Sequence, residues 1–159
     1  MNSNDINFEV LNNIFTCRVV VLIEKNNKIL FQKRKADKVW ALPGGKLSVM
    51  EKTEEGAKRE IFEELGCNIK NLEMLSVTEN FFKANDKNVH QYIFTYKAEL
   101  DTDEFDNFEE FDGIEVGKNV VYRWIEIDRL SEFEIRPDNI KEQIEDMKNK
   151  VMRFYKCEG

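Results

Sequence analysis

The sequence is poor in the residues that build disulfide frameworks, zinc sites and flexible linkers. Its 159 residues include only three cysteines, which are far apart, and one histidine. A scattered, odd set of cysteines argues against a disulfide framework, and a single histidine cannot complete a conventional zinc site. With two prolines and no Gly/Ser-rich stretch, the chain offers no candidate linker. We therefore expect one domain over residues 1–159, with residues 1–13 as a loose polar segment.

Long apolar runs and basic runs are also absent. No apolar stretch reaches the roughly 18 residues of a membrane-spanning helix, and no apolar secretion signal opens the chain. The formal net charge is −7, whereas proteins that grip DNA or RNA backbones usually present a basic face. We expect a soluble cytoplasmic protein that binds neither membrane nor DNA, with RNA a disfavoured partner. An acidic protein that acts on an anionic substrate needs a cation between them.

Hydrophobic periodicity predicts a mixture of strands and helices. Strands are expected at residues 15–24, 28–34, 71–82, 88–100 and 120–127, with a short apolar piece at 40–42. A helix is expected at 53–65, with Thr53 as its N-cap and Gly66 as a left-handed end. A second helix is expected at about 138–154, on the apolar positions Ile140, Ile144, Met147 and Val151. The pattern favours an α/β sandwich around a mixed sheet.

The first predicted helix carries three glutamates on one face. Glu60, Glu63 and Glu64 stand at i, i+3 and i+4, which places adjacent Cβ atoms about 5–6 Å apart. Such like charges repel one another, and Mg²⁺, which prefers oxygen ligands, would remove that repulsion. A solvated acidic face explains the same spacing, so the cluster alone does not select a metal site.

The surroundings of these glutamates resemble the Nudix box. Gly45 is followed by five residues and then Glu51, and seven further residues lead to the run Arg-Glu-Ile-Phe-Glu-Glu-Leu-Gly at 59–66. Each of these fixed positions matches the family pattern. Cys67 stands where the family has an aliphatic residue, and cysteine can pack as a small hydrophobe.

The resemblance covers the chain from Phe15 onward, because the segments 40–46 and 124–128 also look like family segments. It implies a Nudix-type α/β/α sandwich and an enzyme that hydrolyses a pyrophosphate bond with Mg²⁺ or Mn²⁺. The substrate it implies is a small nucleotide, either a nucleoside diphosphate linked to another moiety X or a nucleoside triphosphate. Two alternatives stay open, a non-catalytic nucleotide-sensing module and an RNA 5′ pyrophosphohydrolase. A homodimer is compatible with the sequence.

The resemblance also implies roles for individual residues. Glu60, Glu63 and Glu64 are the expected metal ligands, joined by the carbonyl of Gly44, and Glu60 or Glu63 is the expected general base. Glu51 and Arg59 look like the family's structural ion pair. Lys46 is expected either to face substrate phosphates or to pair with Glu51.

The acidic segment 101–116 holds three candidates for an additional metal ligand, Glu109, Glu110 and Glu115. The alternative is an acidic loop that Phe105, Phe108 and Phe111 anchor. In the strand that follows residue 87, His90, Tyr92, Phe94 and Tyr96 share one face. We expect these four residues to serve packing rather than base stacking.

Overall fold

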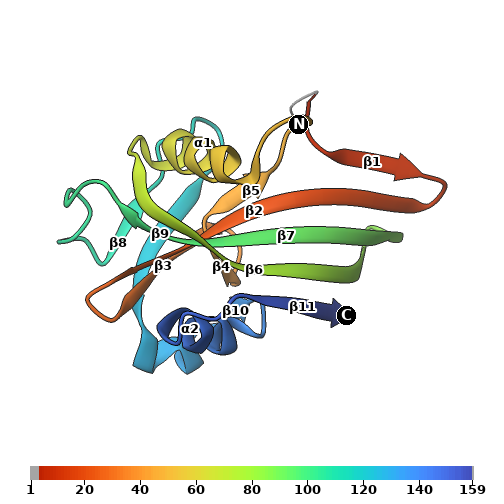
Figure 1. Cartoon of the computed structure of the whole chain (residues 1–159). Coiled ribbons are helices and arrows are strands. Elements are labelled where there is room, and N and C mark those ends of the chain that lie inside the picture. The colour runs from red at the N-terminus through yellow and green to blue at the C-terminus, as the bar shows by residue number, and fades with distance from the viewer. Residues whose placement is uncertain (1–3, 159) are drawn as a thin grey trace.

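The computed structural model describes residues 4–158, which form one mixed sheet of eleven strands, two α-helices and a 3₁₀ helix (Figure 1). The strands are β1 (Asn7–Val10), β2 (Asn13–Lys25), β3 (Lys28–Arg34), β4 (Trp40–Ala41), β5 (Gly44–Lys46), β6 (Ile69–Ala84), β7 (Lys87–Leu100), β8 (Glu110–Asp112), β9 (Val120–Glu126), β10 (Ile135–Arg136) and β11 (Arg153–Glu158). The helices are α1 (Thr53–Leu65), η1 (Ile127–Glu132) and α2 (Ile140–Lys148). Neither α-helix in this part of the chain has the length and apolar character that a membrane span requires.

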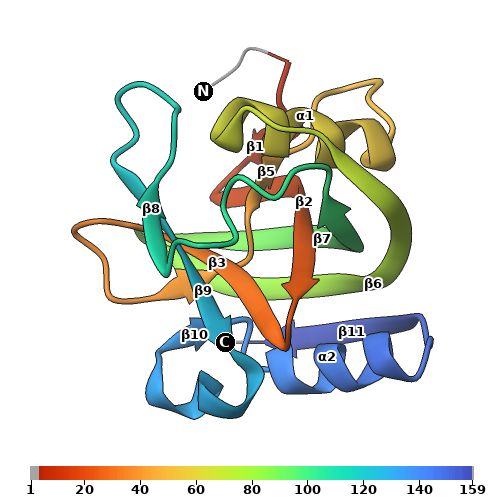
Figure 2. The same cartoon turned by 90° about the vertical axis from the view of Figure 1, so that its left-hand side faces the viewer.

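Three long strands form the centre of the sheet. β6 and β7 pair as an antiparallel hairpin, and β7 also runs parallel to β2. β11 lies parallel to β6 at one side, whereas β1 pairs with β2 and β9 pairs with β3. α1 and α2 lie on opposite sides of this sheet (Figures 1 and 2). The expected sandwich around a mixed sheet is confirmed.

Each helix covers its own apolar cluster. On one side, Val19 and Val21 of β2 pack with Ala57 and Ile61 of α1. On the other side, Leu22 of β2 belongs to the cluster that includes Ile140 and Ile144 of α2. Because successive side chains of a strand point to opposite faces, the apolar run of β2 serves both clusters.

The predicted bounds of α1 are confirmed, but the predicted N-cap is wrong. Lys52 occupies the cap position without a side-chain hydrogen bond, and Thr53 is the first helical residue. The Thr53 hydroxyl instead lies 2.7 Å from the hydroxyl of Tyr96, so it ties the start of α1 to β7. The helix ends as expected at Gly66, which adopts a left-handed φ of 72° and donates its N–H to the Phe62 carbonyl.

The second predicted helix is too long. α2 ends at Lys148, and the chain turns at Lys150, which has a φ of 56°, before it enters β11. Val151 therefore lies outside the helix. Arg153 donates from Nε to both carboxylate oxygens of Asp146, at 2.9 and 3.0 Å, and β11 pairs with β6. This long-range pairing overrides the helical periodicity of the local sequence.

The N-terminal segment also differs from the prediction. Residues 7–10 form β1 and are not loose, because each of them pairs with a residue of β2. Residues 1–3 lie outside the part of the chain that the structure describes.

Candidate active site

A cleft of about 840 Å³ opens between α1 and the edge of the sheet. Its walls come from α1, β2, β3, β5, β9 and the loop that follows β8. The lining side chains include four glutamates and several cations, which are Glu60, Glu63, Glu64, Glu115, Arg18, Arg34, Lys46, Arg59 and Lys118. The cleft therefore combines the predicted glutamates with cations from distant parts of the chain.

The three glutamates of α1 meet different environments. Glu64 is buried, with 6% of its surface exposed, and its Oε2 has no hydrogen-bond partner. Burial, together with the charge of Glu60, raises the pKa of Glu64 to about 8. Burial also raises the pKa of Glu60. Glu63 lies toward solvent, with 46% of its side chain exposed.

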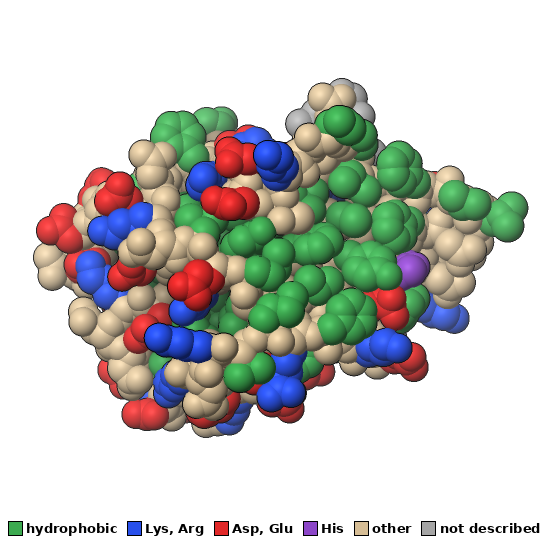
Figure 3. Space-filling view, in the orientation of Figure 1, with side chains coloured by type: hydrophobic (Ala, Val, Ile, Leu, Met, Phe, Trp, Pro, Cys, Tyr) green, Lys and Arg blue, Asp and Glu red, His purple; other side chains and the backbone are tan. Residues whose placement is uncertain are grey.

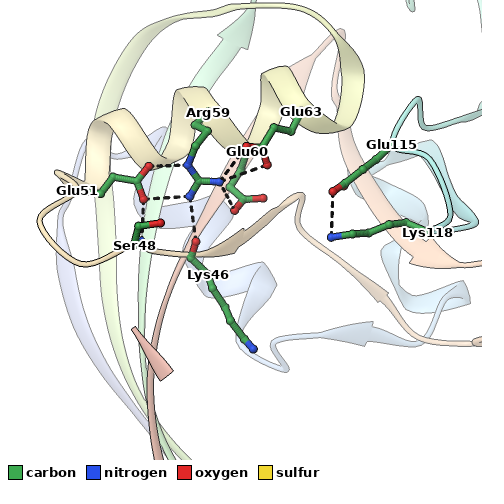
Figure 4. Close-up of polar contacts among 8 residues, drawn as sticks. All are labelled: Lys46, Ser48, Glu51, Arg59, Glu60, Glu63, Glu115 and Lys118. Carbon is green, nitrogen blue, oxygen red and sulfur yellow. Dashed lines mark hydrogen bonds and ion pairs between the residues drawn. The ribbon is translucent and has the colours of Figure 1, made fainter. Parts of the chain in front are cut away.

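Arg59 holds the loop before α1 against the helix (Figure 4). It donates from Nε and Nη2 to the two carboxylate oxygens of Glu51, at 2.6 and 3.0 Å. Its Nη2 also donates to the carbonyl of Lys46 at 3.1 Å, and its Nη1 donates to Glu60 at 2.8 Å. The hydrogen bonds from Arg59 lower the pKa of Glu51. The expected ion pair is thus present, and the same guanidinium also orients Glu60.

The carboxylates are not gathered around one point. Within residues 4–158, no three side chains of His, Cys, Asp or Glu converge as a group that could hold a metal ion. The Nη1 of Arg59 contacts both Glu60, at 2.8 Å, and Glu63, at 3.3 Å.

The chemistry of the site nevertheless fits a hard cation. The orphaned Oε2 of Glu64 is a buried oxygen acceptor, and a buried acceptor without a partner is costly. Burial and the charge of Glu60 raise the pKa of this carboxyl, and the nearby Arg18 opposes the shift without cancelling it. A divalent cation would supply both the missing partner and the missing charge.

Two consecutive glycines allow the backbone to pass close to these groups. A Cβ atom on Gly45 would lie 2.4 Å from Oε2 of Glu60, so any side chain there would displace the carboxylate. A Cβ atom on Gly44 would lie 2.1 Å from the carbonyl oxygen of Val19, and Gly44 has a φ of 148°. Gly44 lines the cleft, and the role of its carbonyl as a ligand stays a prediction.

Lys46 lines the cleft and does not pair with Glu51. The carboxylate of Glu51 binds Arg59, and Figure 4 shows the Lys46 side chain directed away from Glu51. Of the two roles considered for Lys46, the geometry favours contact with a ligand in the cleft.

Two further cations were missed from the sequence. Burial lowers the pKa of Arg18, while the charges of Glu60 and Glu64 oppose that shift. Arg34 lies at the end of β3, on the same face as Gln32. The sequence held a signal for Arg18, because Arg18 is the one charged residue in the apolar run from Phe15 to Ile23.

The acidic segment contributes one of its three candidates to the cleft. Glu115 lines the cleft and pairs with Lys118 at 3.0 Å (Figure 4). Glu109 and Glu110 are instead paired with Arg123 of β9, at 2.8 and 3.5 Å, so the structure does not bring them to the glutamates of α1. Phe105 and Phe111 stack with ring centroids 4.6 Å apart and pack on the core, as the anchoring alternative expects, whereas Phe108 is exposed.

The four residues of β7 that were expected to share one face, His90, Tyr92, Phe94 and Tyr96, do not line this cleft. Tyr96 is buried in the core, and Phe94 packs against it. Tyr92 donates its hydroxyl to Glu79 at 2.7 Å, and His90 stacks on Phe81 with ring centroids 4.4 Å apart. These contacts are packing contacts.

Some known proteins match part of this sequence, and others share its fold. The chain is 34% identical over 64 residues to an RNA pyrophosphohydrolase of Hamiltonella defensa subsp. Acyrthosiphon pisum (strain 5AT), over 40% of this chain and 39% of that protein. It is 45% identical over 49 residues to a putative 8-oxo-dGTP diphosphatase of Bacillus subtilis (strain 168), over 31% of this chain and 33% of that protein. The matches thus span between a third and two fifths of these curated relatives.

Solved structures agree with the sheet and the helices. A MutT protein from Bacillus halodurans superimposes with a TM-score of 0.68 at 19% identity, over 88% of this chain and 89% of that one. A MutT NUDIX hydrolase from Burkholderia pseudomallei gives a TM-score of 0.63 at 26% identity, over 82% and 98%. The NUDIX domain family matches residues 15–146, which is most of the chain. The chain belongs to the NUDIX family.

Proposed function

We propose that this protein is an enzyme that hydrolyses a pyrophosphate bond with the help of Mg²⁺ or Mn²⁺. The substrate class is a nucleoside diphosphate linked to another moiety, or a nucleoside triphosphate. The observation that carries the proposal is the buried carboxylate of Glu64, whose Oε2 has no hydrogen-bond partner and which lies with Glu60 in a cleft that Arg18 and Lys46 also line. Carboxylates suit a cation and the basic side chains suit phosphate oxygens, so one cleft accommodates both partners of the reaction.

We assign the metal to Glu60, Glu63 and Glu64, with Glu115 as the outer candidate on the facing loop. When bound, the metal supplies charge that polarises phosphorus and lowers the pKa of water. Glu64 holds its carboxylate in place because it is buried, and Arg59 fixes Glu60 from the opposite side. Lys46 and Arg18 bind phosphate oxygens and orient the scissile P–O–P linkage.

Of the two candidate bases, we assign the role to Glu60. A general base works best when its pKa lies near the working pH, and burial raises the pKa of Glu60 from the usual range of a carboxyl. Glu60 takes a proton from the attacking water, while Arg59 stabilises the carboxylate before the proton arrives.

Two other functions remain as alternatives. The name of the Hamiltonella relative favours an RNA 5′ pyrophosphohydrolase, whereas the name of the Bacillus relative and the net charge of −7 favour a small nucleotide over a long polyanion. A nucleotide sensor without catalysis has no need of the carboxylates of α1. The cytoplasmic location also remains an inference, which the three free cysteines support.

A substrate screen tests the proposal. The purified chain is assayed with Mg²⁺ or Mn²⁺ against nucleotide sugars, ADP-ribose, dinucleoside polyphosphates, nucleoside triphosphates and a 5′-triphosphorylated RNA. Hydrolysis of a small nucleotide supports the proposal, and preference for RNA with steep salt dependence replaces it with the RNA alternative. Nucleotide binding without turnover identifies a sensor.

A further inference from the structure

One face of the sheet carries aromatic side chains that no helix covers. It lies on the α1 side, where β1, β2, β7, β6 and β11 are neighbours in that order and extend beyond α1 (Figure 1). Register partners share a face, so the face comprises Phe8, Val10, Phe15, Cys17, Val77, Phe81, His90, Tyr92, Phe94 and Phe154. We call these ten residues the aromatic face. Apolar side chains and the one histidine gather there in the space-filling view (Figure 3).

One row of the aromatic face crosses four strands without interruption. Phe8 is opposite Phe15, Phe15 is opposite His90, and His90 is opposite Phe81. The ring of His90 lies 5.3 Å from that of Phe15 and 4.4 Å from that of Phe81. At the two margins, Phe8 is 51% exposed and Phe154 is 53% exposed. A continuous apolar surface of this kind marks an interaction site in a soluble protein.

The opposite face of the same strands encloses polar side chains beside apolar ones such as Val89. Thr16, Thr78 and Gln91 point away from the aromatic face, and all three are buried. In a sheet with one solvated face, polar residues are expected outside and aromatic residues inside. Polar side chains of this sheet are therefore enclosed, whereas Phe8 and Phe154 at the margins of the aromatic face are exposed.

One polar group on the aromatic face, the Tyr92 hydroxyl, is hydrogen-bonded within the chain. The Tyr92 hydroxyl donates to Glu79, whose carboxylate lies 4.0 Å from Nε2 of His90. That nitrogen is buried and has no hydrogen-bond partner. A partner on this face would meet mainly apolar side chains.

We propose that a second copy of this chain covers the aromatic face, so that the protein is a homodimer with two sheets packed face to face. Five strands at about 4.8 Å spacing make a surface roughly 20–25 Å wide, which suits another sheet better than a single peptide. A standard interface uses about 20–30 residues per partner, and the aromatic face supplies its apolar centre.

The charges at the margin are self-complementary. Lys156 and Glu158 lie two residues apart on the same face of β11, next to Glu79 and Phe81. A twofold axis that lies between the two facing sheets and runs perpendicular to β11 at the level of Cys157 places Lys156 opposite Glu158 of the partner subunit, and Glu158 opposite the partner's Lys156. Twofold symmetry repeats the same patch on both subunits, so one pair of opposite charges produces two contacts.

Sedimentation velocity and light scattering of the full chain at about 1–100 μM test the proposal. The wild-type chain is expected to be a dimer, and Phe8→Glu and Phe154→Glu are each expected to raise the dimer dissociation constant at least tenfold. The matched control is Phe62→Glu, which adds the same charge at a 56% exposed phenylalanine of α1, outside the aromatic face. Circular dichroism checks that each variant is folded.

Charge reversal supplies a second measurement that does not depend on the aromatic variants. Lys156→Glu alone and Glu158→Lys alone are each expected to weaken the dimer, and the double variant is expected to restore it. A wild-type chain that stays monomeric at 100 μM, including one that binds another protein through this face, overturns the proposal. So does a dimer that Phe8→Glu and Phe154→Glu leave intact. None of these measurements involves hydrolysis, so their outcome is separate from that of the proposed function.

Discussion

Arg59 donates two hydrogen bonds to the carboxylate of Glu51, from Nε at 2.6 Å and from Nη2 at 3.0 Å. The partners come from different segments, since Glu51 precedes α1 and Arg59 lies within it. Glu51 in turn accepts the backbone N–H of Ser48 at 2.9 Å, so the pair secures the loop that begins at Lys46 (Figure 4). A bidentate hydrogen-bonded pair fixes the relative position of two segments better than a single charge pair does.

Arg59→Ala should lower both stability and rate. Removing the guanidinium leaves the largely buried carboxylate of Glu51 without its partner, at a cost of about 1–3 kcal/mol. Thermal melting and steady-state kinetics measure the two effects, and Arg59→Lys serves as a control that keeps the charge but loses the paired geometry. If the rate fell while the melting temperature did not change, Arg59 would belong with the residues that act on substrate.

Turnover should require Mg²⁺ or Mn²⁺ and should stop with EDTA. Because a ligand that binds only the folded state stabilises it, a metal concentration 100-fold above its dissociation constant should add about 2.7 kcal/mol of stability. Melting curves with and without millimolar Mg²⁺ measure this gain. Full activity in metal-free buffer would refute the proposed chemistry.

Glu64→Gln should abolish the gain from Mg²⁺ while leaving the metal-free protein stable. The pKa of about 8 means that Glu64 is largely protonated at pH 7 without metal, and glutamine resembles that neutral form. Hydrolysis should fall by about 10²–10³, comparable with the loss of one transition-state contact. Glu63→Gln should also slow hydrolysis. Glu55→Gln makes the same substitution at an exposed position of α1 and should change neither property. An unaltered rate in Glu64→Gln would indicate that Glu60, Glu63 and Glu64 form an ordinary solvated acidic face and do not bind metal.

The two glycines should respond differently to alanine. In Gly45→Ala the new Cβ meets the flexible end of Glu60, so the chain should fold while the rate falls at least tenfold. In Gly44→Ala the Cβ meets the backbone of Val19 at a φ of 148°, so stability should fall by about 2–4 kcal/mol. Urea unfolding and kinetics separate the effects. Equal losses of stability in both variants would contradict this division.

Acid should weaken the attachment of β11 through Asp146. The hydroxyl of Tyr155 and then the guanidinium of Arg153 lower the pKa of Asp146. A carboxyl with a lowered folded-state pKa stabilises the fold above its unfolded pKa of about 3.9, and that contribution is lost as the pH falls through the folded value. The difference in melting temperature between wild type and Asp146→Asn should therefore be full at pH 6 and shrink below pH 4. A difference that stays constant down to pH 2 would assign the effect to packing.

Local sequence determined much of the fold and of the candidate site. The bounds of β3 and α1 follow from turn signals and from Gly66, because those signals act within a few residues. The glutamates of α1 could be placed on one face from helical spacing alone. The match of the chain to the NUDIX family agrees with the resemblance that begins at Gly45.

Only the tertiary structure decided the features that depend on distant partners. The segment after Lys148 is a strand because it pairs with β6, which its own helical periodicity does not reveal. Glu115 reaches the cleft whereas Glu109 binds Arg123, although both belong to one acidic segment. Arg18 became a site residue because the sheet brings β2 next to α1. Burial likewise raises the pKa of Glu64, and which side chains are buried depends on the surfaces that the folded chain encloses.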